Sequence, residues 1–292
     1  MARQEVFKSE PLFILGAEDP EMRRVIEILA FEGIAWVFAT HNGQQGDVNT
    51  AYKADVPKNS SGRFLYCIEC DFQNPGLVKP APLYIDHHRL GDAGFNEPPE
   101  NSWSASSLGQ LCTLLEREPQ ANDLAIAAMD HSFAAAVRGE IQGVSTQEVV
   151  ELDLNETARH TGESRDELYV LLRKFDRIIN SASTLYLDST APLNNQSILD
   201  LRGTAIGSGY SASYLSLRLS LVMKGCAALI TTKNRDSPSE PTKVVLIGDV
   251  KPSSVESFIH TFAKNNDLYD IYGVPSRGFA GGYIPRQVLS HE

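Results

Sequence analysis

The sequence has few cysteines, fewer basic than acidic residues, and no long apolar run. Four cysteines in 292 residues are too few to hold a chain of this size together by disulfides. Cys67 and Cys70 form a C-x-x-C pair, but a structural zinc site needs two further ligands nearby, so burial in a strand is favoured. No stretch of about 18 apolar residues occurs, and residues 1–16 lack the apolar core of a signal peptide. We therefore expect a soluble, cytoplasmic protein that has no membrane partner.

Acidic residues outnumber basic ones, 37 to 26, which gives a formal net charge of -11. Proteins bind long duplex nucleic acid largely through Lys and Arg that neutralise phosphates, so this balance argues against such a partner. A small phosphorylated substrate or a short single-stranded oligonucleotide stays open, because bound metal ions reverse the local field. A metal site built from carboxylates would itself contribute to the negative charge.

Apolar runs in the first half of the chain predict an α/β domain over residues 1–145. Short runs with β-branched and aromatic residues indicate strands, and a helical period follows the first of them. The expected strands are residues 12–16, 34–40, 63–72 and 82–88. Helical patterns then dominate up to about Gly139. Strands and helices in this order predict an open, mostly parallel sheet.

The rest of the chain predicts a linker and a second domain. Residues 146–183 are polar and charged with helical spacing, and we expect them to form a helical linker. Residues 184–292 alternate strand-like and helical patterns and end in a glycine-rich segment. A second, smaller α/β domain fits this pattern. Two domains also agree with the length of the chain.

Acidic residues and histidines gather where the expected strands of the first domain end. Open α/β sheets bind ligands at the carboxyl ends of their strands. The residues at this edge are Asp19, Glu21, Asp71, Asp86, His87 and His88. Glu69 competes with Asp71 as a ligand, because strand alternation puts the two on one face. The clustering predicts a metal or phosphate site at this edge.

The Asp86-His87-His88 triplet has a specific chemical use. A carboxylate and a neutral imidazole can share divalent metals such as Mn²⁺, and a second imidazole can contact phosphate or metal. Two metals about 3.5–4 Å apart can clamp a phosphoryl group and generate hydroxide for in-line attack. A chance loop is the alternative for the triplet taken alone.

The segment YIDHHR closely resembles the naming motif of the DHH phosphoesterase superfamily, which includes single-strand exonucleases, oligoribonucleases and family II inorganic pyrophosphatases. The segment SWSASSLGQLCTLLE is similar to the Ala-Ser-Ser segment that opens the next helix in that family. The segment AIAAMDHSF resembles the fourth motif, whose aspartate falls on Asp130. The carboxylates of the first motif fall on Asp19 and Glu21, and that of the second on Asp71. The order of elements matches across residues 12–140.

The resemblance implies an enzyme that uses Mn²⁺ or Mg²⁺ to hydrolyse a phosphoester in a nucleotide or short oligonucleotide. The implied metal ligands are Asp19, Glu21, Asp71, Asp86, His87 and Asp130. The implied catalytic residues are Asp86, His87, His88 and Asp130. Beside them, Arg89 and His131 are expected to contact the substrate.

Two departures from the family pattern leave other functions open. The histidine of the first motif would lie near Leu15 or Gly16, neither of which binds a metal, and Glu21 is one methylene longer than the usual aspartate. A nucleotide- or phosphate-binding regulatory protein with weak or no turnover is therefore an alternative. An inorganic pyrophosphatase is less favoured, because that branch typically carries Asp-His-Asn in place of the Asp86–His88 triplet.

The C-terminal segment Arg277–Tyr283 resembles the glycine-rich loop of the DHH-associated domain, without its usual histidine. We expect Gly278, Gly281 and Gly282 to let backbone amides approach a phosphate. Arg277 can pair with the same phosphate, and Phe279 or Tyr283 can stack on a base. A tight turn is the alternative, since glycine punctuates many turns. A homodimer is also left open.

Overall fold

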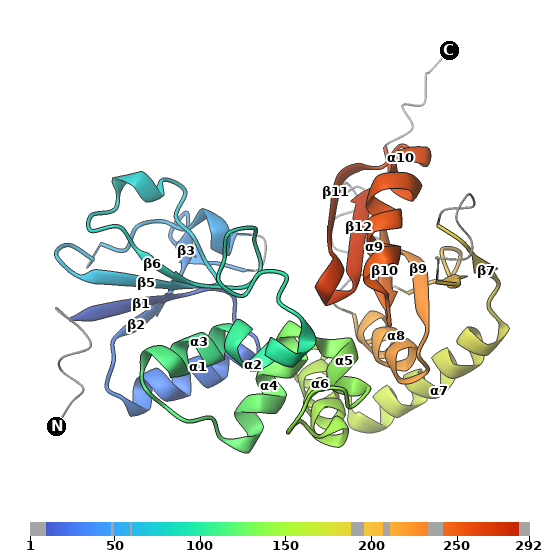
Figure 1. The fold of residues 1–292 in the computed structure, drawn as a ribbon, viewed down its shortest axis with the longest axis horizontal. Helices are drawn as coiled ribbons and strands as arrows, with labels where there is room; N and C mark the ends of the chain where they lie inside the picture. The colour runs from blue at the N-terminus through green and yellow to red at the C-terminus, as the bar shows by residue number, and fades with distance from the viewer. Residues whose placement is uncertain are drawn as a thin grey trace, which may run out of the picture. The chain divides into compact units, whose positions relative to one another are not determined.

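The structure is a computed structural model that describes residues 10–47, 50–58, 60–187, 196–206, 211–232 and 242–285. The chain separates into two compact units (Figure 1). The first unit contains Met1–His131 and Ile141–Val144, and the second contains Ser132–Glu140 and Ser145–Glu292. Each unit has its own sheet and its own apolar core.

The sheet of the first unit has four parallel strands in the order β2-β1-β5-β6. The strands are β1 (Pro11–Leu15), β2 (Trp36–Phe38), β5 (Phe64–Ile68) and β6 (Leu83–Ile85). This confirms the α/β fold class with a mostly parallel sheet. In the register of the sheet, Ile68 is level with Leu15 on one side and Ile85 on the other, so the segments after β1, β5 and β6 begin at one edge.

Helices cover one face of this sheet (Figure 1). They are α1 (Pro20–Phe31), α2 (Ser102–Ala105), α3 (Ser107–Leu114) and α4 (Ala121–His131). Asp19 caps α1 and proline occupies its first position, which is a strong signal for the start of a helix. On the other face, loop residues such as Phe72 pack against strand residues such as Leu65. Cys67 and Cys70 lie in this core as free thiols, as the sequence predicted.

Short elements connect these strands and helices. They are β3 (Thr40–His41), β4 (Gln44–Gln45), η1 (Ala51–Lys53), η2 (Pro75–Leu77) and η3 (Pro99–Asn101). Among them, η1 matters for the site, because it carries Tyr52.

The second unit is built on a mixed sheet in the order β11-β12-β10-β9-β8-β7, in which β8 and β9 are parallel and the other pairs antiparallel. The strands are β7 (Thr184–Leu185), β8 (Ile198–Asp200), β9 (Ala227–Thr232), β10 (Lys243–Gly248), β11 (Tyr269–Val274) and β12 (Phe279–Tyr283). Its helices are α5 (Phe133–Val137), α6 (Thr146–Thr161), α7 (Arg165–Ser181), α8 (Ala212–Met223), α9 (Pro252–Ser257), the π-helix η5 (Phe258–Phe262) and α10 (Ala263–Asn265).

Two apolar layers sandwich this second sheet. Phe175 of α7 and Leu217 of α8 pack on one face, and Val255 of α9 and Phe258 of η5 pack on the other. Helices α6 and α7, which were expected as a linker, both pack against α8 and so belong to the second unit.

Candidate metal centre

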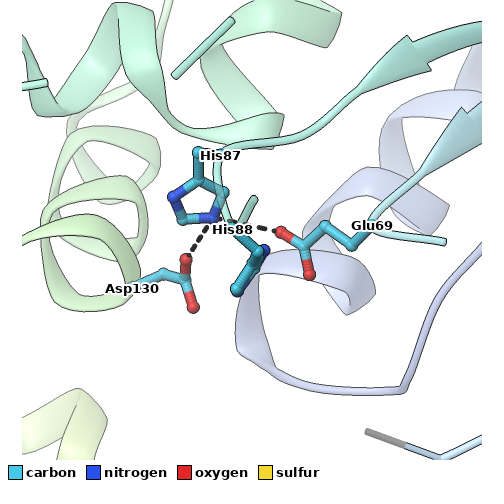
Figure 2. Close-up of side chains that lie close together, drawn as sticks. All are labelled: Glu69, His87, His88 and Asp130. Atoms are coloured by element: carbon cyan, nitrogen blue, oxygen red, sulfur yellow. Dashed lines mark ion pairs between the residues drawn. The ribbon is translucent and has the colours of Figure 1, made fainter. Parts of the chain in front are cut away.

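Four side chains come together beyond the carboxyl edge of the first sheet (Figure 2). Glu69 follows β5, His87 and His88 follow β6, and Asp130 lies in the last turn of α4. One ligand atom from each of these residues lies within 4.8 Å of the others. We call this group the Glu-His-His-Asp cluster. It unites three of the residues predicted from the sequence with Glu69, which was expected only as a competitor of Asp71.

His87 is the centre of the cluster. Its ring is fully buried, and its Nε2 lies 2.8 Å from Oδ2 of Asp130 and 3.3 Å from Oε1 of Glu69. Glu21 of α1 approaches the same nitrogen with Oε2 at 3.8 Å. Within the described residues, His87 Nε2, Glu69 Oε1 and Glu21 Oε2 are buried atoms without a hydrogen-bond partner. Buried polar atoms normally have a hydrogen-bond partner, and these three atoms, which face one another, do not.

The spacing and chemistry of these atoms fit a divalent cation. An octahedral Mg²⁺ with ligands at about 2.0–2.1 Å places neighbouring ligand atoms roughly 3 Å apart and opposite ones roughly 4.2 Å apart. The distances around His87 Nε2 and the 4.8 Å limit of the cluster are close to this range. Carboxylates suit Mg²⁺ and Mn²⁺, whereas imidazoles suit transition metals such as Zn²⁺ and Fe²⁺. The residues present therefore fit a divalent cation, and its identity stays a prediction.

The electrostatics of the cluster follow from its buried carboxylates. Burial, together with the charges of Glu69 and Asp130, raises the pKa of Asp19 and that of Glu21. Burial alone would raise the pKa of Glu69, but the histidines outweigh this and lower it. For His87, burial favours the neutral ring, yet Asp130 and Glu69 raise its pKa to about 11. Excess negative charge in a buried place is the condition that a bound cation would relieve.

Asp86 lies behind the two histidines rather than among the ligand atoms. Its Oδ1 accepts hydrogen bonds from the amides of His87 and His88, at 2.7 and 3.0 Å, and from Nδ1 of His88 at 2.9 Å. Its Oδ2 accepts from the hydroxyl of Tyr52 at 3.0 Å. Burial raises the pKa of Asp86, but the bonds from His88 and Tyr52 lower it overall. Oδ1 therefore holds the two histidines and Oδ2 holds Tyr52, and Asp86 is not among the four residues of the cluster. Its role as a direct ligand stays a prediction.

Asp71 also lies outside the cluster. Its carboxylate accepts from the hydroxyl of Tyr84 at 2.8 Å and from Arg89 Nη1 at 3.2 Å. The expected strand over residues 63–72 ends at Ile68, because Glu69 has a left-handed backbone with φ of 51°. The alternation that would place Glu69 and Asp71 on one face is broken there. Glu69, not Asp71, is the carboxylate that reaches the cluster.

Arg89 interacts with residues beside the cluster. Its guanidinium pairs with Asp71 and stacks over the ring of Tyr52, with 4.3 Å from Cζ to the ring centroid. About 39% of its side chain is exposed, so one side of the group stays accessible to a phosphate. A role in substrate binding therefore stays a prediction.

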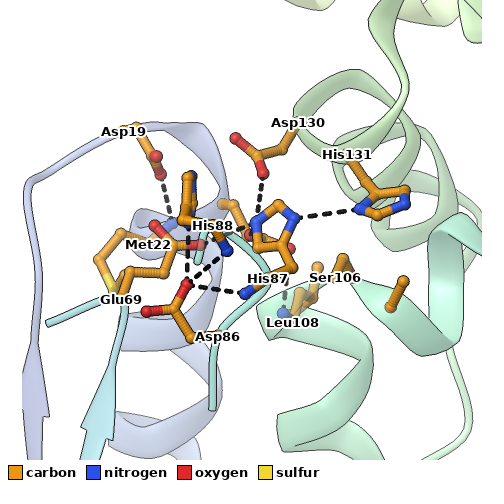
Figure 3. Close-up of polar contacts among 12 residues, drawn as sticks. Asp19, Met22, Glu69, Asp86, His87, His88, Ser106, Leu108, Asp130 and His131 are labelled. Atoms are coloured by element: carbon orange, nitrogen blue, oxygen red, sulfur yellow. Dashed lines mark hydrogen bonds and ion pairs between the residues drawn. The ribbon is translucent and has the colours of Figure 1, made fainter. Parts of the chain in front are cut away.

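The segment that was expected to resemble the first motif carries the carboxylates of Asp19 and Glu21, and position 16 has no room for a histidine. Asp19 accepts from the amide of Met22 at 2.7 Å (Figure 3). Oε1 of Glu21 accepts from the amide of Leu108 at 2.9 Å. A Cβ on Gly16 would lie 2.4 Å from the carbonyl oxygen of Glu69, and Leu15 is buried in the core. No side chain larger than hydrogen fits at position 16 without a backbone shift.

His131 lies beside His87 (Figure 3) and is buried. It is 1% exposed, with Nδ1 at 3.0 Å from Nδ1 of His87 and Nε2 at 3.1 Å from the carbonyl oxygen of Glu97. Both ring nitrogens are occupied by protein groups. The expectation that His131 contacts substrate is therefore corrected: the ring is a buried partner of His87.

The glycines of the C-terminal segment serve the sheet of the second unit. Gly278 follows the 3₁₀ turn η6 (Pro275–Arg277) with φ of 66°, whereas Gly281 and Gly282 lie in β12, which pairs with β10 and β11. Amides of such a central strand are used by the sheet ladder. A Cβ on Gly281 would meet the hydroxyl of Tyr272 at 2.4 Å, so this glycine makes room for a ring. The expected cradle of free amides at Gly281 and Gly282 is therefore corrected.

Comparison with known proteins adds little beyond this geometry. No protein-family model matches the sequence, and no curated protein matches it. Among solved structures, a pGpG-specific phosphodiesterase, PggH, from Vibrio cholerae is 11% identical with a TM-score of 0.35, covering 95% of this chain and 94% of that one. A putative family II inorganic pyrophosphatase from Methanococcus jannaschii is 12% identical with a TM-score of 0.27, covering 96% and 97%. At these values the function has to be argued from the residues of the site.

Proposed function

We propose that this chain is a metal-dependent phosphoester hydrolase of the DHH superfamily that acts on a nucleotide or a short oligonucleotide. The observation that carries the proposal is the convergence of buried acceptor atoms on His87 Nε2 within the Glu-His-His-Asp cluster. Hydrolysis of a phosphoester needs a cation that neutralises the phosphoryl oxygens, and this cluster has the donor set for Mn²⁺ or Mg²⁺. When bound, such an ion acts as a Lewis acid and lowers the pKa of water.

The side chains of the cluster divide into a buried and an accessible half. Glu69 and His87 are buried, which suits residues that hold the ion in place. The side chains of Asp130 and His88 are 20% and 31% exposed, which suits residues that also meet a substrate. Because Nδ1 of His88 is directed at Asp86, its Nε2 is the nitrogen left for the metal or the phosphate. Asp19 and Glu21 supply two further carboxylates beside this centre.

Phosphate binding by arginine is the second part of the proposal. Arg89 stands next to the triplet. A charge-assisted contact to phosphate contributes about 1.5–3 kcal/mol, so Arg89→Ala should raise the substrate KM roughly ten- to a hundredfold without changing metal content. An unchanged KM would remove Arg89 from the substrate site. Phosphate binding by Arg277 stays a separate prediction.

Small phosphorylated molecules or short single strands are the proposed substrates, and long duplex nucleic acid is not. Among the helices that the structure describes, none has the length and apolar character needed to cross a membrane. Cytoplasmic location and a homodimer stay predictions.

A regulatory binding protein with weak turnover is the second candidate, and two observations favour it. Gly16 cannot be replaced by the metal-binding histidine of the family, and Glu21 has one oxygen committed to the amide of Leu108. Both features reduce the ligands available to a second ion. An inorganic pyrophosphatase is less favoured, because the third residue of the triplet is His88 rather than asparagine.

One assay separates these candidates. The purified protein is incubated with Mn²⁺ or Mg²⁺ and a panel of dinucleotides, cyclic dinucleotides, short single strands, 3′-phosphoadenosine phosphate and pyrophosphate, with and without excess EDTA. Metal-dependent hydrolysis of a nucleotide supports the proposed enzyme. Tight binding of a panel member without hydrolysis supports the regulatory protein, cleavage of pyrophosphate alone supports the third candidate, and full activity in EDTA contradicts the metal-dependent mechanism.

A further inference from the structure

A buried chain of hydrogen bonds leads away from the cluster through His131. Nδ1 of His87 lies 3.0 Å from Nδ1 of His131, and Nε2 of His131 lies 3.1 Å from the main-chain oxygen of Glu97. The two imidazole rings are tilted at 36° with centroids 5.3 Å apart. Both rings are at most 1% exposed, so water does not compete for these bonds.

The acceptor at the end of this chain of hydrogen bonds determines which atom donates at each step. A carbonyl oxygen only accepts, so Nε2 of His131 must carry the proton that it donates to Glu97. In a neutral His131, Nδ1 then has a lone pair and accepts from Nδ1 of His87. The proton on Nδ1 of His87 is thereby fixed by His131. Nε2 of His87 faces Glu69 and Asp130, and this nitrogen would bind a cation held between them.

The two histidines of the triplet are thus fixed in the same way by different partners. His88 directs Nδ1 at the carboxylate of Asp86, at 2.9 Å, whereas His87 directs Nδ1 at a neutral imidazole. Partners of this kind set the tautomer and orientation of a metal-binding histidine. The neutral partner of His87 adds no further negative charge beside Glu21, Glu69 and Asp130.

We propose that His131 is a positioning residue that fixes His87 as its Nδ1–H tautomer and so keeps Nε2 available to the metal. The role in metal binding rests on the proposed function. The bond pattern itself rests only on the geometry of Glu97, His131 and His87. His131 acts through His87 and does not touch the substrate.

The test compares two substitutions at position 131. His131→Leu fills a similar volume and removes both hydrogen bonds. His131→Asn keeps an oxygen near the place of Nδ1, so it still accepts from His87. We expect His131→Leu to weaken Mn²⁺ binding in calorimetric titrations by about ten- to a hundredfold, as loss of such an outer partner typically does, and His131→Asn to recover most of this loss. Thermal unfolding of each variant checks that the fold is intact.

A spectroscopic measurement tests the bond pattern without any metal-dependent activity. Long-range ¹H–¹⁵N correlation spectra of the labelled wild type, metal-free and with diamagnetic Mg²⁺, should show His131 as the neutral Nε2–H tautomer in both states. His87 should be protonated at Nδ1 in both states. His131 found as the Nδ1–H tautomer, or Mn²⁺ affinity unchanged in His131→Leu, would overturn the proposal. A wild type that binds neither ion but shows the expected tautomer of His131 would contradict the proposed function and leave the bond pattern standing.

Discussion

The carboxyl edge of the first sheet and the glycine-rich strand of the second unit both carry residues that resemble a phosphate-handling motif. At the first place, parallel strands end level with one another, and the residues that follow them turn their side chains toward one point. At the second place, β12 runs between two antiparallel neighbours. The space that side chains at Gly281 and Gly282 would need is filled by Tyr272 and Leu268.

The difference shows that what a motif can do depends on whether its residues lie within a strand or after it. Residues after a parallel strand have left the sheet, so their side chains and amides are available to a ligand. Residues within a central strand have their amides in the ladder. Substitutions at the first place should therefore affect metal binding and activity, and those at the second should affect stability.

The largest effect is expected for His87→Ala, which removes the central nitrogen of the cluster. Metal binding contributes several kcal/mol of transition-state stabilisation, so the hydrolysis rate should fall by about a hundredfold or more. The rate on any panel substrate, measured at saturating Mn²⁺ beside wild type, checks this. Retention of more than a tenth of the wild-type rate would place the chemistry elsewhere.

A smaller effect is expected when the support of the histidines is weakened. Asp86→Asn removes the charge that holds His88 and should reduce metal affinity by about ten- to a hundredfold. Tyr52→Phe removes one hydrogen bond to Asp86, worth about 1 kcal/mol, and should reduce the affinity about fivefold. Calorimetric titration with Mn²⁺ compares the two variants. The ranking would be refuted by a larger effect of Tyr52→Phe.

These two residues also mark how far sequence could predict the site. The parallel sheet, the triplet after β6 and Asp130 in α4 follow from apolar runs and a motif, because they depend on local pattern. Tyr52 is 34 residues from Asp86, and no local signal connects the two. The choice of Glu69 over Asp71 depends on a single left-handed residue that ends β5, which the residue type does not reveal.

Metal should stabilise the first unit selectively. At a concentration of one hundred times Kd, an ion that binds only the folded state adds about 2.7 kcal/mol, which corresponds to a rise in Tm of roughly 5–15 °C for a unit of this size. The sequence has two tryptophans, Trp36 and Trp103, and both lie in the first unit, so their fluorescence reports its unfolding. A Tm that does not respond to Mn²⁺ or Mg²⁺ would argue against a metal site there.

An effect on stability alone, with none on metal binding, is expected for Gly281→Ala in the second unit. The added methyl group would force the ring of Tyr272 to move, and such overpacking costs about 1–3 kcal/mol of unfolding free energy. Urea unfolding followed by circular dichroism measures the loss, and Mn²⁺ affinity should stay at the wild-type value. Loss of phosphate-ligand binding with unchanged stability would instead show that Gly281 faces a ligand.

The central claim is that Glu69, and not Asp71, completes the metal centre with His87, His88 and Asp130. Equilibrium binding of Mn²⁺ to wild type, Glu69→Gln and Asp71→Asn tests it directly, because each substitution removes one negative charge at positions two residues apart. We predict that Glu69→Gln weakens binding by at least about tenfold, since a carboxylate that binds the metal directly contributes more than one that only orients a ligand, and that Asp71→Asn binds as wild type does. The opposite order, or equal binding by all three proteins, would contradict the account.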